Sequence, residues 1–283
     1  MTAATARIGP LTVMALDDAE GPHFDLREHL IPDATPEDWA AADAMDPGSL
    51  APDGRWWLRF RSFAIRRGDS GPVTFVDAGI GPAGSLAADW TPVPGRLPDA
   101  LAGAGIDAKD VTAIVLTHLH TDHIGWAVPS DSPFHNARVI VQKADVDAYV
   151  AAAAAATLNA AEEEDPFPRQ NEVLLTPLRQ QGRLQVIEGD VRLSPEVNII
   201  ATPGHTPGHQ SVMVESGDES LLVTGDLLVH AVQLVRPELA YVFDLDAEMA
   251  RRSRLSALER AASRGTVLGV SHLGTAWSRT EKG

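Results

Sequence analysis

The sequence predicts a folded α+β protein in which strands ending in acidic or histidine residues are interspersed with a few helices. Hydrophobic residues make up 44% of its 283 residues and charged residues 22%, which are ordinary values for a globular protein with a sizeable core. Several apolar, β-branched runs stop abruptly at Asp or His, as buried strands do when they deliver a site at their carboxyl ends. The second half repeats the strand and helix themes of the first, across a break near 165–170. We therefore expect a single domain over residues 1–283, made of two similar halves.

The composition excludes several classes of partner and chemistry. The formal net charge of -16 makes an acidic surface that repels phosphate backbones, so nucleic acid is not expected as a partner. The chain has no cysteine, which excludes disulfides, thiolate metal ligands and a cysteine nucleophile. Residues 1–10 lack the pattern of a leader, and no apolar run reaches the roughly 18 residues of a spanning helix. These features predict a cytoplasmic protein that acts on a small molecule without a membrane partner, with the oligomeric state open, a homodimer included.

Each predicted strand is an apolar run of alternating or β-branched residues between turn signals. In the first half these runs cover residues 8–16, 57–66, 73–76, 111–116 and 137–142. In the second half they cover residues 184–187, 191–193, 197–201, 210–215, 220–224 and 266–270. A turn at 17–21 is expected to close the first strand, and glycine-containing turns at 67–71 and 216–219 are expected to make hairpins.

Helices are predicted over residues 36–43, 97–104, 143–164 and 248–264. Thr35 can cap the first of these, and Pro36 suits the first helical position. The third contains six consecutive alanines, the residue with the highest helix propensity, and a proline-containing breaker at 165–168 ends it. Gly265 is well placed to end the last helix. Residues 23–54 show no sustained period outside the short helix and are expected to form a long surface excursion.

The most informative stretch runs from Thr117 to His123, directly after a predicted buried strand. It holds four side chains that can bind a metal, namely His118, His120, Asp122 and His123. Alternation along an extended segment puts the first two on the same side, whereas Asp122 and His123 lie beyond the strand and can face a second centre. Imidazole and carboxylate suit zinc, and also iron, manganese or cobalt, so the ligand types alone do not select the metal.

Other strand ends present residues of the same kind, namely Asp77, His205, Asp226 and His272. Loops on one edge of a sheet come together, so residues distant in sequence can share one pocket. Two metal centres fit this number of ligands better than one. Asp77 is expected to hold a neighbouring backbone or a ligand imidazole, and His209 to fix its own loop, both without binding metal.

Together these motifs resemble the metallo-β-lactamase fold superfamily. The resemblance is carried, in family order, by Asp77-Ala78-Gly79, His118-Leu119-His120-Thr121-Asp122-His123, Pro203-Gly204-His205-Thr206-Pro207-Gly208-His209, Gly225-Asp226 and Ser271-His272. It implies a four-layer αββα sandwich made of two similar halves. It also implies one metal held by His118, His120 and His205, a second held by Asp122, His123 and His272, and Asp226 bridging the two.

Within that superfamily the chain looks most like the branch of methyl-parathion-hydrolase-like proteins and N-acyl homoserine lactonases. The long section before Asp77, the turn ending at Trp126, and Gln233 soon after the bridging aspartate support this branch. Two departures are expected to change the pocket wall. The lactonases are similar here but place a tyrosine soon after that aspartate, where this chain has Val229 and His230. The related hydrolases also continue past the last histidine with a Pro- and Phe-containing loop and further strands, where this chain reads Leu273-Gly274-Thr275-Ala276-Trp277.

These features predict a binuclear hydrolase that uses two divalent metal ions, zinc first. In this hypothesis the metals lower the pKa of a bridging water from ~15.7 towards ~7, and the resulting hydroxide attacks an ester or lactone with an apolar portion, or else a phosphotriester. Asp122 and Asp226 would orient the hydroxide and accept protons, and His230, if it faces the pocket, would steady the oxyanion or leaving group. Five aromatic residues could furnish an apolar rim: Trp126, Phe134, Tyr241, Phe243 and Trp277.

Three other functions remain open on the same fold. A glutathione-thioester hydrolase would need basic residues for the glutathione carboxylates, and the sequence does not place them. A mono-iron sulfur dioxygenase uses fewer ligands. A metal-stabilised binding protein with an altered pocket is the non-enzymatic alternative. A flavin-dependent diiron oxidoreductase is disfavoured, because the pattern of that group resembles His-x-Glu and the residue here is His120.

Overall fold

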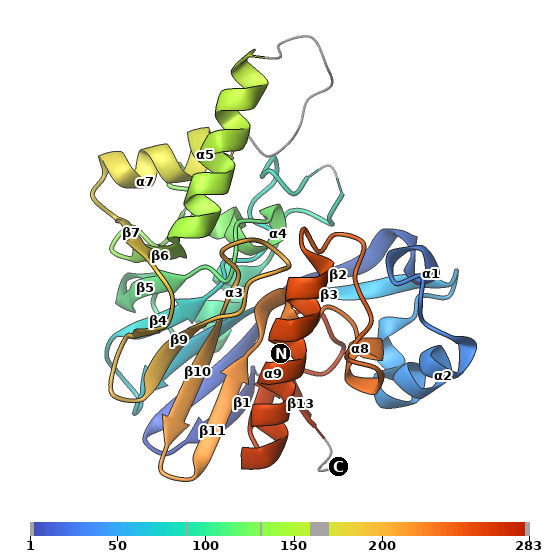
Figure 1. Cartoon of the computed structure of the whole chain (residues 1–283). Helices are drawn as coiled ribbons and strands as arrows, with labels where there is room; N and C mark the ends of the chain where they lie inside the picture. The colour runs from blue at the N-terminus through green and yellow to red at the C-terminus, as the bar shows by residue number, and fades with distance from the viewer. Residues whose placement is uncertain (1–2, 89, 131, 159–169, 281–283) are drawn as a thin grey trace.

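The computed structural model describes residues 3–88, 90–130, 132–158 and 170–280, and it contains two stacked β-sheets with helices on their outer faces (Figure 1). The first sheet has the strand order β1 to β7: Ala4–Ile8, Leu11–Leu26, Arg55–Arg67, Val73–Val76, Val111–Val115, Arg138–Gln142 and Leu184–Ile187. Strands β1 to β4 pair antiparallel, and β4 to β7 pair parallel. Because β4, β5 and β6 are parallel, the segments that follow them leave the sheet at the same edge.

The second sheet has the order β13-β12-β11-β10-β9-β8. In chain order its strands β8 to β13 cover Val191–Arg192, Val197–Ala201, Gln210–Ser216, Glu219–Val223, Val267–Gly269 and Trp277–Arg279. Its pairs are antiparallel except for β11 with β12, which run parallel. The last strand was not predicted, and it pairs with β12 through Trp277 opposite Gly269.

The α-helices are α1 Arg27–Leu30, α2 Pro36–Met45, α3 Leu97–Gly103, α4 Thr121–Ile124, α5 Lys143–Leu158, α7 Thr176–Gln180, α8 Val232–Val235 and α9 Ala247–Arg264. Short 3-10 turns cover Pro47–Ser49, Ala108–Asp110, Gly125–Ala127 and Gly225–Leu227, and a π-helical turn covers Asn171–Leu175. The predicted caps are present. Thr35 and Asp38 form a capping box on α2, and Gly265 ends α9 with a left-handed φ of 66°.

Three layers of apolar side chains separate the four layers of secondary structure. Between the sheets, residues of β2 to β6 such as Phe63 and Ile140 pack against residues of β9 to β11 such as Val212. Helices α3, α5 and α7 bury their apolar sides on the outer face of the first sheet. Helix α9 covers the second sheet (Figure 1), where its Leu258 packs in one cluster with Leu222 and Leu268. The α+β class and the four-layer αββα sandwich are thus confirmed.

Residues 23–54, expected to form a surface excursion, are largely exposed but are anchored to the rest of the fold by buried side chains. Strand β2 continues through the predicted turn, with an irregularity in register between Asp17 and Ala19, and ends only at Leu26. Beyond it, Leu30 and Trp39 are buried in the same cluster as residues of the second half. Helix α2 lies beside α8 (Figure 1), so this segment covers one side of the second half of the chain.

The predicted break at 165–168 and the last part of the predicted helix over 143–164 lie outside the described residues. Within the described ranges, none of the helices is both long enough and apolar enough to cross a lipid bilayer.

Candidate metal centre

Four strand ends deliver the predicted ligands to one place. His118 and His120 follow β5, and Asp122 and His123 belong to the short helix α4 that begins directly after His120. His205 lies in the loop between β9 and β10. The remaining two ligands, Asp226 and His272, follow β11 and β12 respectively.

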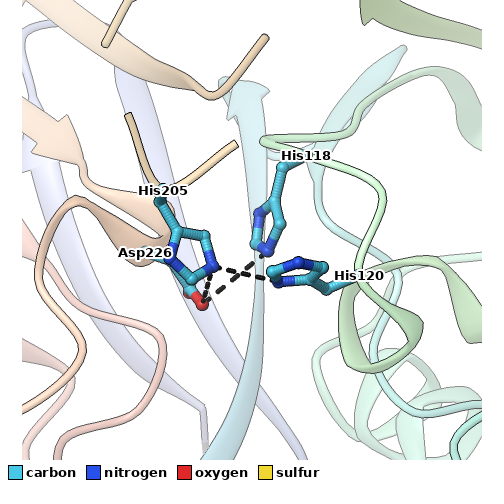
Figure 2. Close-up of side chains that lie close together, drawn as sticks. All are labelled: His118, His120, His205 and Asp226. Atoms are coloured by element: carbon cyan, nitrogen blue, oxygen red, sulfur yellow. Dashed lines mark hydrogen bonds and ion pairs between the residues drawn. The ribbon is translucent and has the colours of Figure 1, made fainter. Parts of the chain in front are cut away.

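The first cluster consists of His118, His120, His205 and Asp226, whose ligand atoms all lie within 4.8 Å of one another (Figure 2). His205 Nε2 is 3.0 Å from His120 Nδ1 and 3.2 Å from Asp226 Oδ2. His118 Nε2 is 3.7 Å from the same carboxylate oxygen. Four potential ligands therefore converge from three separate segments of the chain.

The second cluster consists of Asp122, His123 and His272, again within 4.8 Å of one another. Asp226 joins it through its other oxygen, since Oδ1 is 3.0 Å from His272 Nε2 and 3.2 Å from His123 Nε2. Asp226 thus presents Oδ2 to the first cluster and Oδ1 to the second. The structure brings all seven predicted ligands together, with this aspartate between the clusters.

The tautomers of four histidines fit a pair of metal ions. The Nδ1–H groups of His123 and His205 donate to the carboxylates of Asp77 and Asp244, at 2.8 Å and 3.0 Å. His272 Nδ1 donates to the Arg59 carbonyl oxygen at 2.8 Å, and His118 Nδ1 lies 3.0 Å from the Thr117 hydroxyl oxygen. Carboxylate and carbonyl oxygens can only accept, and the Thr117 hydroxyl already donates its hydrogen to Asp77, so in the neutral rings Nε2 carries the lone pair and points into the centre.

His118 gives the clearest sign of a missing partner. Its Nε2 atom is fully buried and has no hydrogen-bond partner among the described residues. An unsatisfied buried acceptor costs roughly 1–3 kcal/mol, so proteins rarely keep one without a use. A divalent cation between imidazole nitrogens and carboxylate oxygens would satisfy it, and this donor set suits zinc. The residues present therefore fit two divalent cations.

Asp77 supports both clusters without entering either, as predicted. Its Oδ1 accepts from the Thr117 backbone N–H at 2.7 Å, and its Oδ2 accepts from the Thr117 hydroxyl at 3.0 Å and from His123. Through Thr117 it also fixes the ring of His118. His209 plays a similar part, because its Nε2 accepts from the Asp226 backbone N–H at 3.0 Å and its Nδ1 bonds within its own loop, to Thr202.

Sequence reasoning missed Asp244 and the Arg59 carbonyl, which orient His205 and His272. Asp244 is one of many acids in the chain, and nothing in its neighbourhood in the sequence separates it from the solvated ones. In the structure its side chain is 1% exposed, and its Oδ2 also accepts from the Tyr241 backbone N–H at 3.1 Å. A backbone carbonyl such as that of Arg59 carries no signal in the residue type.

Burial and neighbouring charges set the protonation of the centre. Burial would lower the pKa of His205, but hydrogen bonds to Asp226 and Asp244 outweigh it and raise this pKa to about 9. Burial and the charge of His205 lower the pKa of His120 to about 3. Burial would raise the pKa of Asp226, but the adjacent imidazoles, His123 first, hold it well below its usual range. Asp226 is thus ionised, and binding of cations there would displace protons from the imidazoles.

A cavity of about 530 Å³ opens onto this centre. Its floor includes side chains of both clusters, namely His120, Asp122, His205, Asp226 and His272. Its walls are mainly apolar, and they include Phe24, Trp56, Trp90, Val242, Phe243 and Leu245. The cavity therefore combines a polar floor with an apolar wall, the usual composition of a small-molecule site.

The predicted aromatic rim is only partly correct. Of the five residues, Tyr241 and Phe243 line the cavity. Phe134 is fully buried beneath α3 and α5, Trp277 packs on Phe63 between the sheets, and the Trp126 indole N–H donates to Asp18. The aromatic residues that line the cavity wall also include Phe24, Trp56 and Trp90. Phe24 lies in the segment 23–54, and Trp56 lies in β3, the strand that follows it.

His230 does not face the cavity, so the expected contact with an oxyanion or leaving group was wrong. The residue is fully buried, edge-on to Trp39 and Trp56 at centroid distances of 5.2 Å and 5.1 Å. Its Nδ1 accepts from the Val232 backbone N–H, and burial lowers its pKa to about 3. The preceding residue, Val229, lines the cavity instead.

The sequence itself matches a family model. A model of the metallo-beta-lactamase superfamily matches residues 61–264, which is more than half of the chain. The chain belongs to this superfamily. The range matched runs from β3 to the end of α9 and contains every ligand of the two clusters except His272.

Curated members of the superfamily that resemble this one include N-acyl homoserine lactonases. One from Bacillus sp is 32% identical over 121 residues, which is 43% of this chain and 40% of the relative. The lactonase AiiA from Bacillus thuringiensis subsp. kurstaki is 32% identical over 132 residues, covering 46% and 44% of the two chains. The matched part of the chain spans less than half of the length of these two lactonases.

Solved structures share the fold of this superfamily member over its whole length. The hydrolase AbOPH of the β-lactamase superfamily superposes with a TM-score of 0.81 at 22% identity, covering 100% of this chain and 94% of its own. AidC, a dizinc quorum-quenching lactonase in complex with a homoserine product, gives a TM-score of 0.76 at 23% identity, covering 99% and 94%. At these identities the comparison supports the fold alone.

Proposed function

We propose that this protein is a binuclear metal-dependent hydrolase of uncharged esters and lactones that carry an apolar portion. The observation that carries the proposal is the placement of Asp226, whose two oxygens face two histidine clusters on the floor of an apolar cavity. N-acyl homoserine lactones are the first substrates to test, because relatives bear that name. Phosphotriesters are the second class, since they are also uncharged and apolar.

His118, His120 and His205 would hold one metal ion, and Asp122, His123 and His272 the other, with Asp226 shared between them. Zinc is our first choice for both, because imidazole and carboxylate are its usual ligands in cysteine-free sites. Bound divalent cations would supply Lewis acidity towards a carbonyl or phosphoryl oxygen and would lower the pKa of a water molecule from ~15.7 towards ~7.

The protein's own carboxylates would orient the attacking water and hold its proton. Burial would raise the pKa of Asp122, but the charges of His123 and His272 outweigh it and lower that pKa, so the group is ionised at neutral pH. Its Oδ2 lies 3.6 Å from His272 Nε2, and the residue lines the cavity floor. From there Asp122 can accept a hydrogen bond from water beside a bound substrate and pass a proton towards the leaving oxygen.

The cavity wall favours an uncharged substrate with an apolar chain. Burial of apolar surface contributes about 25 cal/mol per Å² and has no preferred direction. Aromatic side chains such as Trp56 and Phe243 can therefore bind the acyl chain of a substrate without fixing its length. Among the described residues that line the cavity there is no lysine or arginine. This favours lactones and esters over a glutathione thioester, whose carboxylates need cationic partners.

Metal analysis of the purified protein combined with a substrate panel tests the proposal. We expect two metal ions per chain and hydrolysis of N-acyl homoserine lactones or apolar esters above that of a glutathione thioester. Two bound metals with no hydrolysis across lactones, esters and phosphotriesters would support the binding-protein alternative. A single iron per chain would support the dioxygenase instead.

A further inference from the structure

Tyr241 and His23 are two of the polar side chains that line the cavity outside the metal centre. Tyr241 is 8% exposed and His23 is 2% exposed. Among the described residues, neither the Tyr241 hydroxyl nor His23 Nε2 has a hydrogen-bond partner. Neither atom belongs to the fully buried unpartnered atoms of the described residues, so both are reachable from the cavity, where a ligand can accept a hydrogen bond from them.

The two side chains lie near different clusters, and Trp56 contacts both of them. The Tyr241 ring stacks on His205 of the first cluster, with centroids 6.1 Å apart and an interplanar angle of 17°. The His23 ring stacks on Trp56 at 5.8 Å and 11°, and Trp56 meets His272 of the second cluster edge-on at 6.3 Å. Trp56 also meets Tyr241 at 6.3 Å, so its indole lies between the two polar groups.

Both groups are hydrogen-bond donors at neutral pH. His23 Nδ1 accepts from the Asp25 backbone N–H at 3.1 Å, so the proton of the neutral ring is on Nε2. Burial lowers the pKa of His23 to about 4, which keeps the ring neutral. The Tyr241 hydroxyl keeps its proton at neutral pH, because a tyrosine side chain ordinarily has a pKa of about 10.

We infer that the Tyr241 hydroxyl and the His23 Nε2–H are substrate-binding donors, which bind two separate acceptor oxygens of one uncharged substrate. This inference rests on the proposed function and narrows its substrate class. A simple alkyl lactone or ester has acceptor oxygens only at its reacting group, and one donor is enough for them. Two donors near different clusters fit a lactone or ester with a second acceptor, such as an amide carbonyl, near the reacting group.

Conservative substitutions separate these donors from the packing of their rings. Tyr241→Phe keeps the ring on His205 and removes only the hydroxyl. His23→Asn keeps an acceptor for the Asp25 N–H but is too short to replace Nε2, whereas His23→Gln can place an amide N–H near the Nε2 position. Tyr149, the other of the two tyrosines in the chain, is buried on α5 away from the cavity, so Tyr149→Phe is the matched control.

The zinc-loaded variants would be compared on N-hexanoyl homoserine lactone and on a γ-lactone with an alkyl chain of similar length and no amide. For the amide-bearing lactone we expect Tyr241→Phe and His23→Asn each to lower kcat/KM about tenfold, and the double variant about a hundredfold. For the alkyl lactone the double variant should lose no more than one single variant does. His23→Gln should recover part of the loss, and Tyr149→Phe should match the wild type.

The number of bound metals and the Tm separate a binding role from a structural one. Both should stay at the wild-type value in Tyr241→Phe and His23→Asn. Undiminished kcat/KM in these variants, or the same loss on both lactones together with loss of metal, would overturn the inference while the proposed function stands. A wild-type protein that hydrolyses neither lactone would overturn the proposed function, and this inference with it.

Discussion

Asp244 offers the sharpest test of how the first metal centre is built. Its Oδ1 accepts from His205 Nδ1 at 3.0 Å, its Oδ2 accepts from the Tyr241 backbone N–H at 3.1 Å, and its side chain is 1% exposed. Asp244→Asn has the same shape but only one acceptor, so one of the two donors loses its partner. In either case the His205 ring is held less firmly, or its proton can move from Nδ1 to Nε2. Metal binding requires the opposite tautomer, in which Nε2 carries a lone pair.

The expected magnitude follows from the kind of contact. Loss of a carboxylate that orients a ligand histidine weakens metal binding by about 10- to 100-fold, which corresponds to roughly 1.4–2.7 kcal/mol. The loss should fall on the centre that contains His205 and leave the one that contains His123 near its original affinity, because Asp77 holds that ring. Stepwise competition with a chromogenic chelator measures the two affinities separately.

Asp246 provides a matched control two residues away. It caps helix α9 by accepting from the Met249 backbone N–H at 2.9 Å, and asparagine is an equally good cap. Asp246→Asn makes the same change of charge, and we expect both metal affinities to stay unchanged. Wild-type affinities at both centres in Asp244→Asn, or an equal loss at both, would refute the reasoning.

Three further predictions concern the ligands, the cavity and the loop of His205. Asp226→Ala or His120→Ala should remove metal and turnover together, measured by elemental analysis and kcat/KM, and full activity in either variant would contradict the site assignment. Because each buried methylene contributes about 0.8 kcal/mol, kcat/KM should rise about fourfold per methylene of the acyl chain until the cavity is filled, and a flat series would argue against chain binding there. Burial raises the pKa of Asp145, which accepts from Thr206 and Gly208, to about 6. Between about pH 4 and pH 6 the folded state then binds more protons than the unfolded chain, so the free energy of unfolding should fall by about 3 kcal/mol as the pH rises through this range. Asp145→Asn should lack this component in urea titrations of the metal-free protein, and identical pH profiles for the two proteins would contradict it.

Much of the metal centre could be read from local patterns. A buried strand is an apolar run of a few residues, and the residues that follow it leave the sheet at its edge, so His118, His120 and Asp226 could be placed without any knowledge of long-range contacts. The same local signals placed the caps of α2 and α9. They failed where context outweighed them: the acidic turn signal at 17–21 lies inside β2, because that strand pairs with β3 along nearly its whole length.

The ligand types, their order along the chain and the strands that carry them are properties of short segments, and the amino-acid sequence determined them. Which partners hold those ligands was decided by contacts across long separations: Asp244 meets His205 over 39 residues, and the Arg59 carbonyl meets His272 over 213. The same is true of the cavity wall, where Phe24 and Trp56 face Tyr241 and Phe243 from the other half of the chain. Hydrophobic burial is not directional and acts between any apolar surfaces that the fold brings together, so a segment with no period of its own became part of the pocket only when the two halves packed.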